Sequence, residues 1–244
     1  MEQDNMDDSS YLDFDGPFLT NLPPSIRRYT YHGEQQFSNI FESESSTNSE
    51  LILFHASKET IEALFNPDQE TPIAKLCSSF DTKERLFLIT MPSKPHSATI
   101  RGDDRGKQPD HGWGPRRRAR GEPDSPSVVL EVAYSESNSK SNSDVRFWLN
   151  PNEGNANICL TLQIHKSRPE IRIEKWERRQ GRIYRSEVTY ITKKGDHSNV
   201  THHPINIPFE SLLRRPSERG ERDIEFSRGQ LVEIAETIWE TQGW

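Results

Sequence analysis

A glutamate stands inside the most apolar strand-like run of the sequence, residues 127–134, where Glu131 lies between Leu130 and Val132. The β-branched residues and the leucine around it favour a buried strand. Burying an unpaired carboxylate is costly or raises its pKa. The chain must therefore give Glu131 a partner inside the protein, or expose it on the polar face of an edge strand.

A second acid, Asp110, follows Pro109 in a turn-like segment. Taken singly, an aspartate after a proline is usually a turn residue, and a glutamate in a strand usually faces solvent. Taken together, two acids of this kind can hold a divalent cation between neighbouring strands, because perturbed acids cluster at functional sites. Asp110 and Glu131 are therefore the candidate metal ligands.

The charge of the chain is acidic overall but uneven. The 244 residues carry a formal net charge of -7, which argues against a protein that coats nucleic acid nonspecifically. Residues 115–120 nevertheless contain Arg116, Arg117, Arg118 and Arg120 close to Asp110. This basic run is either a solvated loop or a phosphate contact beside the acidic site.

The composition also bears on the environment of the protein. Only Cys77 and Cys159 occur, and their spacing suggests neither a zinc site nor a disulfide framework, so a reducing compartment is expected. The sequence shows no hydrophobic leader and no apolar run long enough to cross a membrane. We expect an intracellular protein, in the nucleus or cytoplasm, without a membrane partner.

The sequence divides into three parts. Residues 1–50 are acidic and rich in Ser and Asn, and we expect an irregular arm that docks through Tyr11, Phe14, Phe18 and Leu19. Residues 51–205 form the expected α/β core, and residues 206–244 a basic linker followed by an amphipathic helix. The low hydrophobic content of 31% agrees with part of the chain being loosely packed.

Periodicity predicts the main elements of the core. Residues 92–126 are read as a long loop-like stretch with short strand character possible around Asp110. The order of elements indicates an α/β fold in which helices flank a sheet. We expect helices over 58–65, 138–149 and 227–240, and strands over 85–91, 127–134, 158–164, 170–176 and 183–191.

Several motifs carry a family resemblance over residues 84–180. The chain resembles an uncharacterised fungal family that is itself similar to the PD-(D/E)XK, or restriction-endonuclease-like, superfamily, most closely to the bacterial Uma-like nucleases. The resemblance implies a restriction-endonuclease-like mixed sheet flanked by helices. The motifs that carry it are residues 91–93, 107–110, 126–137, Asp144, Trp148-Leu149 and 171–176.

The same resemblance implies roles for particular residues. In that superfamily an Asp and a Glu on adjacent strands bind Mg²⁺ together with a backbone carbonyl, which corresponds here to Asp110, Glu131 and the carbonyl of Val132. The ion, Mg²⁺ or Mn²⁺, lowers the pKa of a water and neutralises charge on the scissile phosphate. The implied substrate is DNA.

The sequence departs from the superfamily pattern in two places. The lysine expected two residues after Glu131 is replaced by Ala133. Lys140 is the leading replacement, with Arg146 and Lys107 as alternatives, although none is at diagnostic spacing and a surface cation is the more common role of each. The second departure is the short segment 94–106, in which the helix that the family places before the Asp motif is absent or shortened.

Three interpretations therefore remain open. The first is a metal-dependent nuclease-like domain, a possible Mg²⁺-dependent endodeoxyribonuclease, that acts on DNA phosphodiesters. The second is a catalytically degenerate relative that acts as a binding or interaction module, because fold does not imply function. The third is a structural protein in which Glu131 is solvated. Gln163, a polar residue in an apolar strand, either supports the site or is a satisfied core amide.

Overall fold

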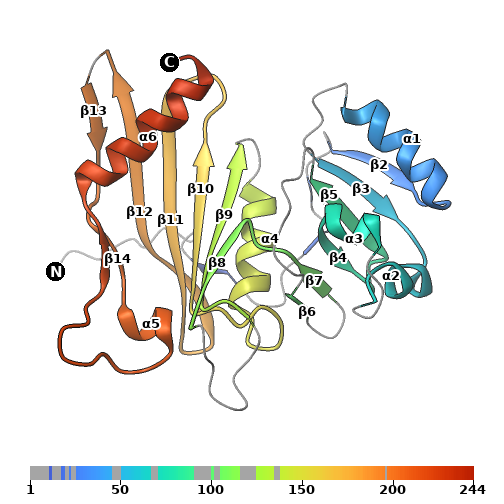
Figure 1. Cartoon of the computed structure of the whole chain (residues 1–244), viewed down its shortest axis with the longest axis horizontal. Coiled ribbons are helices and arrows are strands. Elements are labelled where there is room, and N and C mark those ends of the chain that lie inside the picture. The colour runs from blue at the N-terminus through green and yellow to red at the C-terminus, as the bar shows by residue number, and fades with distance from the viewer. Residues whose placement is uncertain are drawn as a thin grey trace.

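The computed structural model describes residues 11–12, 18–19, 22, 26–45, 51–66, 71–90, 100–101, 105–115, 125–134, 138–195 and 197–244. These residues form two large β-sheets with one helix, α4 (Asn138–Leu149), between them (Figure 1). The described part of the chain contains no helix that is both long and apolar enough to cross a membrane.

The first sheet, sheet A, has seven strands in the order β1-β12-β11-β10-β9-β8, with β13 paired to β12. Only β9 and β10 are parallel, because the crossover helix α4 connects them. The strands are β1 (Tyr11–Leu12), β8 (His111–Trp113), β9 (Val128–Tyr134), β10 (Ile158–Ile164), β11 (Glu170–Arg179), β12 (Arg182–Lys194) and β13 (His197–Val200).

Helices cover both faces of sheet A. Alternate residues of a strand point to opposite faces, so Val129 and Cys159 pack with α4, while Leu162 and Ile173 pack with α6 (Arg228–Gln242). Helix α6 begins at a capping box made by Ser227 and Gln230. The segment before it contains α5 (Phe209–Leu213) and a small sheet of β14 (Ile205–Ile207) and β15 (Ile224–Phe226).

The second sheet, sheet B, has six strands in the order β2-β3-β5-β4-β7-β6. Its outer face packs against three helices through an aromatic core that includes Phe54 and Phe87, while Leu53 and Leu88 point the other way, into the core around α4. Its elements are β2 (Arg27–Thr30), α1 (Glu34–Ser45), β3 (Leu51–His55), α2 (Lys58–Leu64), α3 (Pro72–Leu76), β4 (Cys77–Asp81), β5 (Leu86–Thr90), β6 (Ile100–Arg101) and β7 (Arg105–Lys107).

Most elements with a strong hydrophobic period lie where the sequence predicts them. The predictions of an α/β fold, a mixed sheet and flanking helices are confirmed. Helix α4 and strand β10 have the predicted bounds, and α6 and β12 each extend a few residues beyond them. Phe18 and Leu19 are buried in the core around α4, as expected of the docking arm, whereas Phe14 lies outside the described residues.

The expectation of an irregular arm over residues 1–50 needs correction. Residues 27–45 form β2 and α1, which are integral to sheet B. The apolar contacts of α1, Phe37, Ile40 and Phe41, stand at i, i+3 and i+4, so the helix carries a local signal that the acidic, Ser- and Asn-rich composition of the arm outweighed in the prediction. The stretch 92–126 likewise contains the short strands β6, β7 and β8, which are too short for a detectable alternation.

Candidate functional site

The segment Lys107 to Asp110 is the passage from one sheet to the other. Lys107 is the last residue of β7 in sheet B, and Asp110 immediately precedes β8 in sheet A. Gln108 fixes the passage, since its backbone N–H donates to Ser78 O at 3.1 Å and its Nε2 donates to Ala74 O at 3.2 Å. The two-residue link between them, Gln108 and Pro109, therefore keeps the ionisable side chains of Lys107 and Asp110 close together where the two sheets meet.

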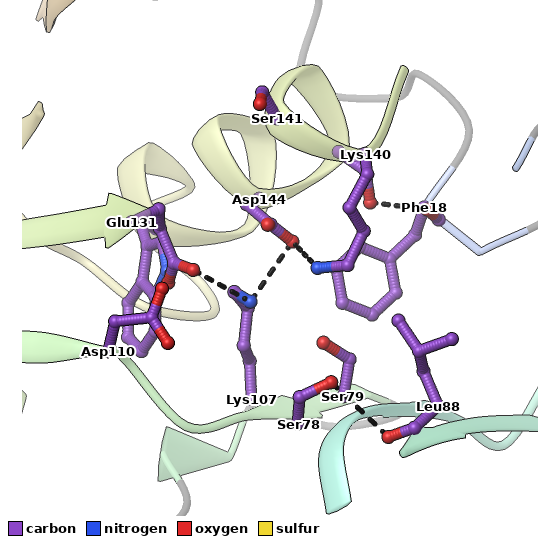
Figure 2. Close-up of polar contacts among 12 residues, drawn as sticks. Phe18, Ser78, Ser79, Leu88, Lys107, Asp110, Glu131, Lys140, Ser141 and Asp144 are labelled. Atoms are coloured by element: carbon purple, nitrogen blue, oxygen red, sulfur yellow. Dashed lines mark hydrogen bonds and ion pairs between the residues drawn. The ribbon is translucent and has the colours of Figure 1, made fainter. Parts of the chain in front are cut away.

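Strand register brings Asp110 beside Glu131. His111 pairs with Leu130 across the antiparallel strands β8 and β9, so the preceding residue, Asp110, comes opposite Glu131. Asp110 Oδ2 accepts a 2.7 Å hydrogen bond from the backbone N–H of Val132. Figure 2 shows the two carboxylates next to each other, on the side of β9 that faces α4. The two acids singled out from the sequence thus share one site.

Glu131 is buried and fully paired. Only 7% of the residue is exposed, so the interpretation of Glu131 as a solvated strand residue is wrong. Its Oε2 lies 3.2 Å from Lys107 Nζ, and its Oε1 accepts a hydrogen bond of 2.5 Å from Trp148 Nε1 of α4. These two partners reduce the cost of removing the carboxylate from water.

A third acid, Asp144, completes the cluster from helix α4. Its Oδ1 lies 3.0 Å from Lys107 Nζ and also accepts a hydrogen bond from Lys140 Nζ (Figure 2). Lys140, Asp144 and Trp148 are spaced four residues apart, which aligns them along one face of the helix. This spacing is visible in the sequence and could have marked Asp144 as a site residue, a role that the motif alone did not indicate.

The structure separates the three candidate cations. Lys107, buried to 1% exposure, is the one that reaches Glu131. Lys140, the leading candidate from the sequence, instead contacts Asp144. Arg146 is two residues from both Asp144 and Trp148, so it projects from another side of α4. Gln163 Nε2 donates to Ser141 Oγ at 3.5 Å, which agrees with the interpretation of a satisfied amide.

Burial and charge shift the pKa values of the cluster. Burial, reinforced by Asp144 and Asp110, raises the pKa of Glu131 to about 8 against the opposing effect of Lys107. Burial lowers the pKa of Lys107, but the charges of Asp144 and Glu131 outweigh it and raise that pKa above its usual value. Burial lowers the pKa of Lys140, which Asp144 offsets only in part. Lys107 is therefore the fixed positive charge of the site.

The donor atoms suit a hard divalent cation. Mg²⁺ and Mn²⁺ prefer carboxylate and carbonyl oxygens, which Asp110, Glu131 and the Val132 carbonyl would supply. Among the residues described in the structure, no group of three or more His, Cys, Asp or Glu side chains is arranged to hold a metal ion. Both Glu131 oxygens already have partners, so a cation would have to share Oε2 with Lys107 or Oε1 with Trp148.

The predicted phosphate contacts of the basic run, Arg116 to Arg118 and Arg120, lie outside the described residues. In comparisons with known protein families, characterised proteins and solved structures, the chain matches none. The case for a function therefore rests on the geometry of this cluster and on the motifs that form it.

Proposed function

We propose that the protein is a metal-dependent, nuclease-like hydrolase that acts on DNA phosphodiesters at the Asp110–Glu131 pair. The observation that carries the proposal is the convergence of Asp110, Glu131 and Lys107 on one point from two sheets. This convergence supplies the two acids and one ammonium group that such chemistry needs. The finer assignment of the fold as restriction-endonuclease-like is part of the same proposal.

Asp110, Glu131 and the Val132 carbonyl would hold the ion. When bound, Mg²⁺ or Mn²⁺ supplies the charge that lowers the pKa of a water and neutralises the scissile phosphate. Lys107 takes the place of the lysine missing at Ala133, because its Nζ lies 3.2 Å from Glu131 Oε2. In this position the ammonium group can donate a hydrogen bond that orients the attacking water, and Asp144 and Glu131 hold it there.

A second candidate is a degenerate relative of the nuclease fold that acts as a binding or interaction module. The observation in its favour is that Lys107 and Trp148 already occupy both oxygens of Glu131. Such a closed cluster can serve as a structural ion pair between the two sheets and α4. The two functions differ in whether a divalent ion can engage the acids and whether that ion promotes cleavage.

The test uses nicking of supercoiled DNA by the purified protein in Mn²⁺. We expect weak nicking by the wild type and none by Glu131→Gln, because the amide keeps the shape but loses the anionic ligand. The control is Glu187→Gln, an acid of β12 that pairs with Lys175 and should leave nicking unchanged. If the wild type and Glu131→Gln are equally inactive, the result favours the binding-module function.

Thermal unfolding tests the ion separately from the chemistry. A ligand that binds only the folded state raises the melting temperature, so Mn²⁺ should stabilise the wild type. Asp110→Asn should lose this shift and Glu187→Gln should keep it. A shift of equal size in all three proteins would place the ion elsewhere, and a site-specific shift without nicking would indicate an inactive metal site.

A further inference from the structure

The face of sheet A that carries Glu131 continues beyond the acids into a more exposed row. Residues paired across neighbouring strands point to the same face. One row contains Glu131, Thr161 and Glu174, and the next row, towards the end of β9, contains Ala133, Gln163, Arg172 and Tyr190. Glu131, Thr161 and Glu174 are buried, whereas Ala133, Gln163 and Arg172 are half-buried and Tyr190 is exposed.

A local surplus of positive charge lies beside this row. Glu174 Oε1 accepts hydrogen bonds from both Arg172 Nη2 and Arg185 Nη1, so two guanidinium groups share one carboxylate. Its Oε2 accepts from Trp176 Nε1 at 3.2 Å and from Thr161 Oγ1 at 3.4 Å. Glu174 therefore fixes Arg172 in place without cancelling the charge of both arginines.

Arg172 and Tyr190 form a cation–π pair in this more exposed row. The guanidinium carbon of Arg172 lies 5.8 Å from the centre of the Tyr190 ring. Tyr190 is 38% exposed, although it is a large aromatic residue. The buried Nε of Arg172 has no hydrogen-bond partner among the described residues. The pair thus offers a positioned cation and a partly exposed aromatic ring.

We propose that the Arg172–Tyr190 pair binds an unpaired nucleotide of a single-stranded DNA segment next to the cleavage site. This inference rests on the proposed function and specifies its substrate class. Arginine contacts phosphate through charge and hydrogen bonds, and an exposed tyrosine ring stacks on a base. A base must leave the duplex stack to reach such a ring, so the pair favours single strands over duplex DNA.

The spacing of the two sites agrees with one continuous strand. Neighbouring strands are about 4.8 Å apart and residues rise about 3.3 Å along a strand, so Arg172 lies roughly 12 Å from Glu131. An unstacked strand is more extended than the roughly 3.4 Å per nucleotide of duplex DNA, so the pair lies within a few nucleotides of the scissile phosphate. Because the net charge of the chain is -7, such local contacts are needed to hold a polyanion.

The experiment measures binding of a fluorescent single-stranded oligonucleotide by anisotropy, without metal, with the full chain carrying Glu131→Gln. In this background Tyr190→Ala should weaken binding about tenfold, whereas Tyr190→Phe, which keeps the ring, should bind like the parent. Arg172→Gln should weaken binding and reduce the salt slope by about one. The matched control is Arg179→Gln, at the exposed β11–β12 turn.

The outcomes separate this inference from the proposed function. Three results would each overturn the inference. Arg172→Gln and Arg179→Gln could weaken binding equally, or Tyr190→Ala could bind as well as Tyr190→Phe. The third result is that duplex DNA binds as tightly as single-stranded DNA. Melting temperatures of the variants identify any loss of binding that comes from unfolding, and Arg172→Lys offers a second variant that keeps the charge but loses the planar fork. Nicking by wild type alongside any of these results would leave the nuclease proposal standing.

Discussion

Two buried glutamates lie in the same row of sheet A, Glu131 on β9 and Glu174 on β11, with Thr161 of β10 between them. Each accepts a hydrogen bond from an indole, Trp148 in one case and Trp176 in the other. They differ in the source of their cations. Both arginines of Glu174 come from β11 and β12 of the same sheet, whereas the lysine of Glu131 comes from β7 of sheet B.

The difference shows that burial alone does not mark a functional acid. Glu174 is paired with two cations within one hairpin, an arrangement that stabilises the hairpin. Glu131 shares one lysine with Asp144 and lies beside Asp110, and burial raises its pKa to about 8. Around Glu131 the acids outnumber the cations that contact this carboxylate, so the site can still accept another cation. Glu131 is therefore the candidate for chemistry, and Glu174 is the candidate for a structural role.

The largest expected effect is on stability at Glu174. Glu174→Gln should lower the free energy of unfolding by about 3 kcal/mol, because it leaves two partly buried guanidinium groups without their carboxylate. Glu131→Gln should cost under about 1 kcal/mol, since Lys107 keeps Asp144 as a partner. Urea denaturation measures both values. Equal losses would remove the distinction between the two glutamates.

The next effect concerns pH. The pKa of Glu131 is about 8 in the folded protein and near 4.5 in the unfolded chain. Between pH 4.5 and pH 8 the folded state therefore binds more protons than the unfolded state. Stability should therefore fall as pH rises through this window, because the folded protein must release a proton from a buried carboxyl group that the unfolded chain has already ionised. Denaturation midpoints at pH 5 and pH 8 should show the fall in wild type and in Glu174→Gln but not in Glu131→Gln. A slope that survives in Glu131→Gln would assign it to other groups.

A smaller effect should distinguish the two lysines of the site. Lys107→Met should cost about 1–2 kcal/mol at pH 8, because Asp144 loses a buried cation and Glu131, whose pKa rises further without Lys107, must keep its proton in the folded state. The cost should shrink at pH 6, where Glu131 takes up a proton. Lys140→Met is the matched control, with a cost under about 0.5 kcal/mol, because Lys107 still pairs with Asp144. The opposite ranking would restore Lys140 as the principal cation.

The smallest effect should come from the threonine between the two glutamates. Thr161→Val removes a hydrogen bond of 3.4 Å to Glu174 Oε2, which Trp176 Nε1 also contacts. We expect a loss of about 0.5 kcal/mol and no change in the pH dependence attributed to Glu131. Denaturation at pH 5 and pH 8 checks both points. A change in that pH dependence would mean that the two glutamates are coupled through Thr161.

The sequence alone was sufficient for the elements with a strong hydrophobic period. Helix α4, strand β10 and the amphipathic helix α6 lie at or near their predicted bounds. The proximity of Asp110 to Glu131 was also predicted, because two such acids on neighbouring strands are the ligands of a divalent-cation site. In contrast, β2 and the short strands β6 to β8 depend on long-range pairing and carry little local signal.

The sequence determined that one acid, Glu131, lies inside an apolar strand and that a second, Asp110, precedes it in a turn-like segment, but burial of Glu131 was decided by the tertiary structure. Only the tertiary structure decided which cation meets Glu131. Lys107 reaches it because Lys107 and Asp110 stand at the two ends of the link between the sheets. Lys140 contacts Asp144 because both lie on one face of α4. Contacts across separate sheets depend on packing, which no local spacing of residues encodes.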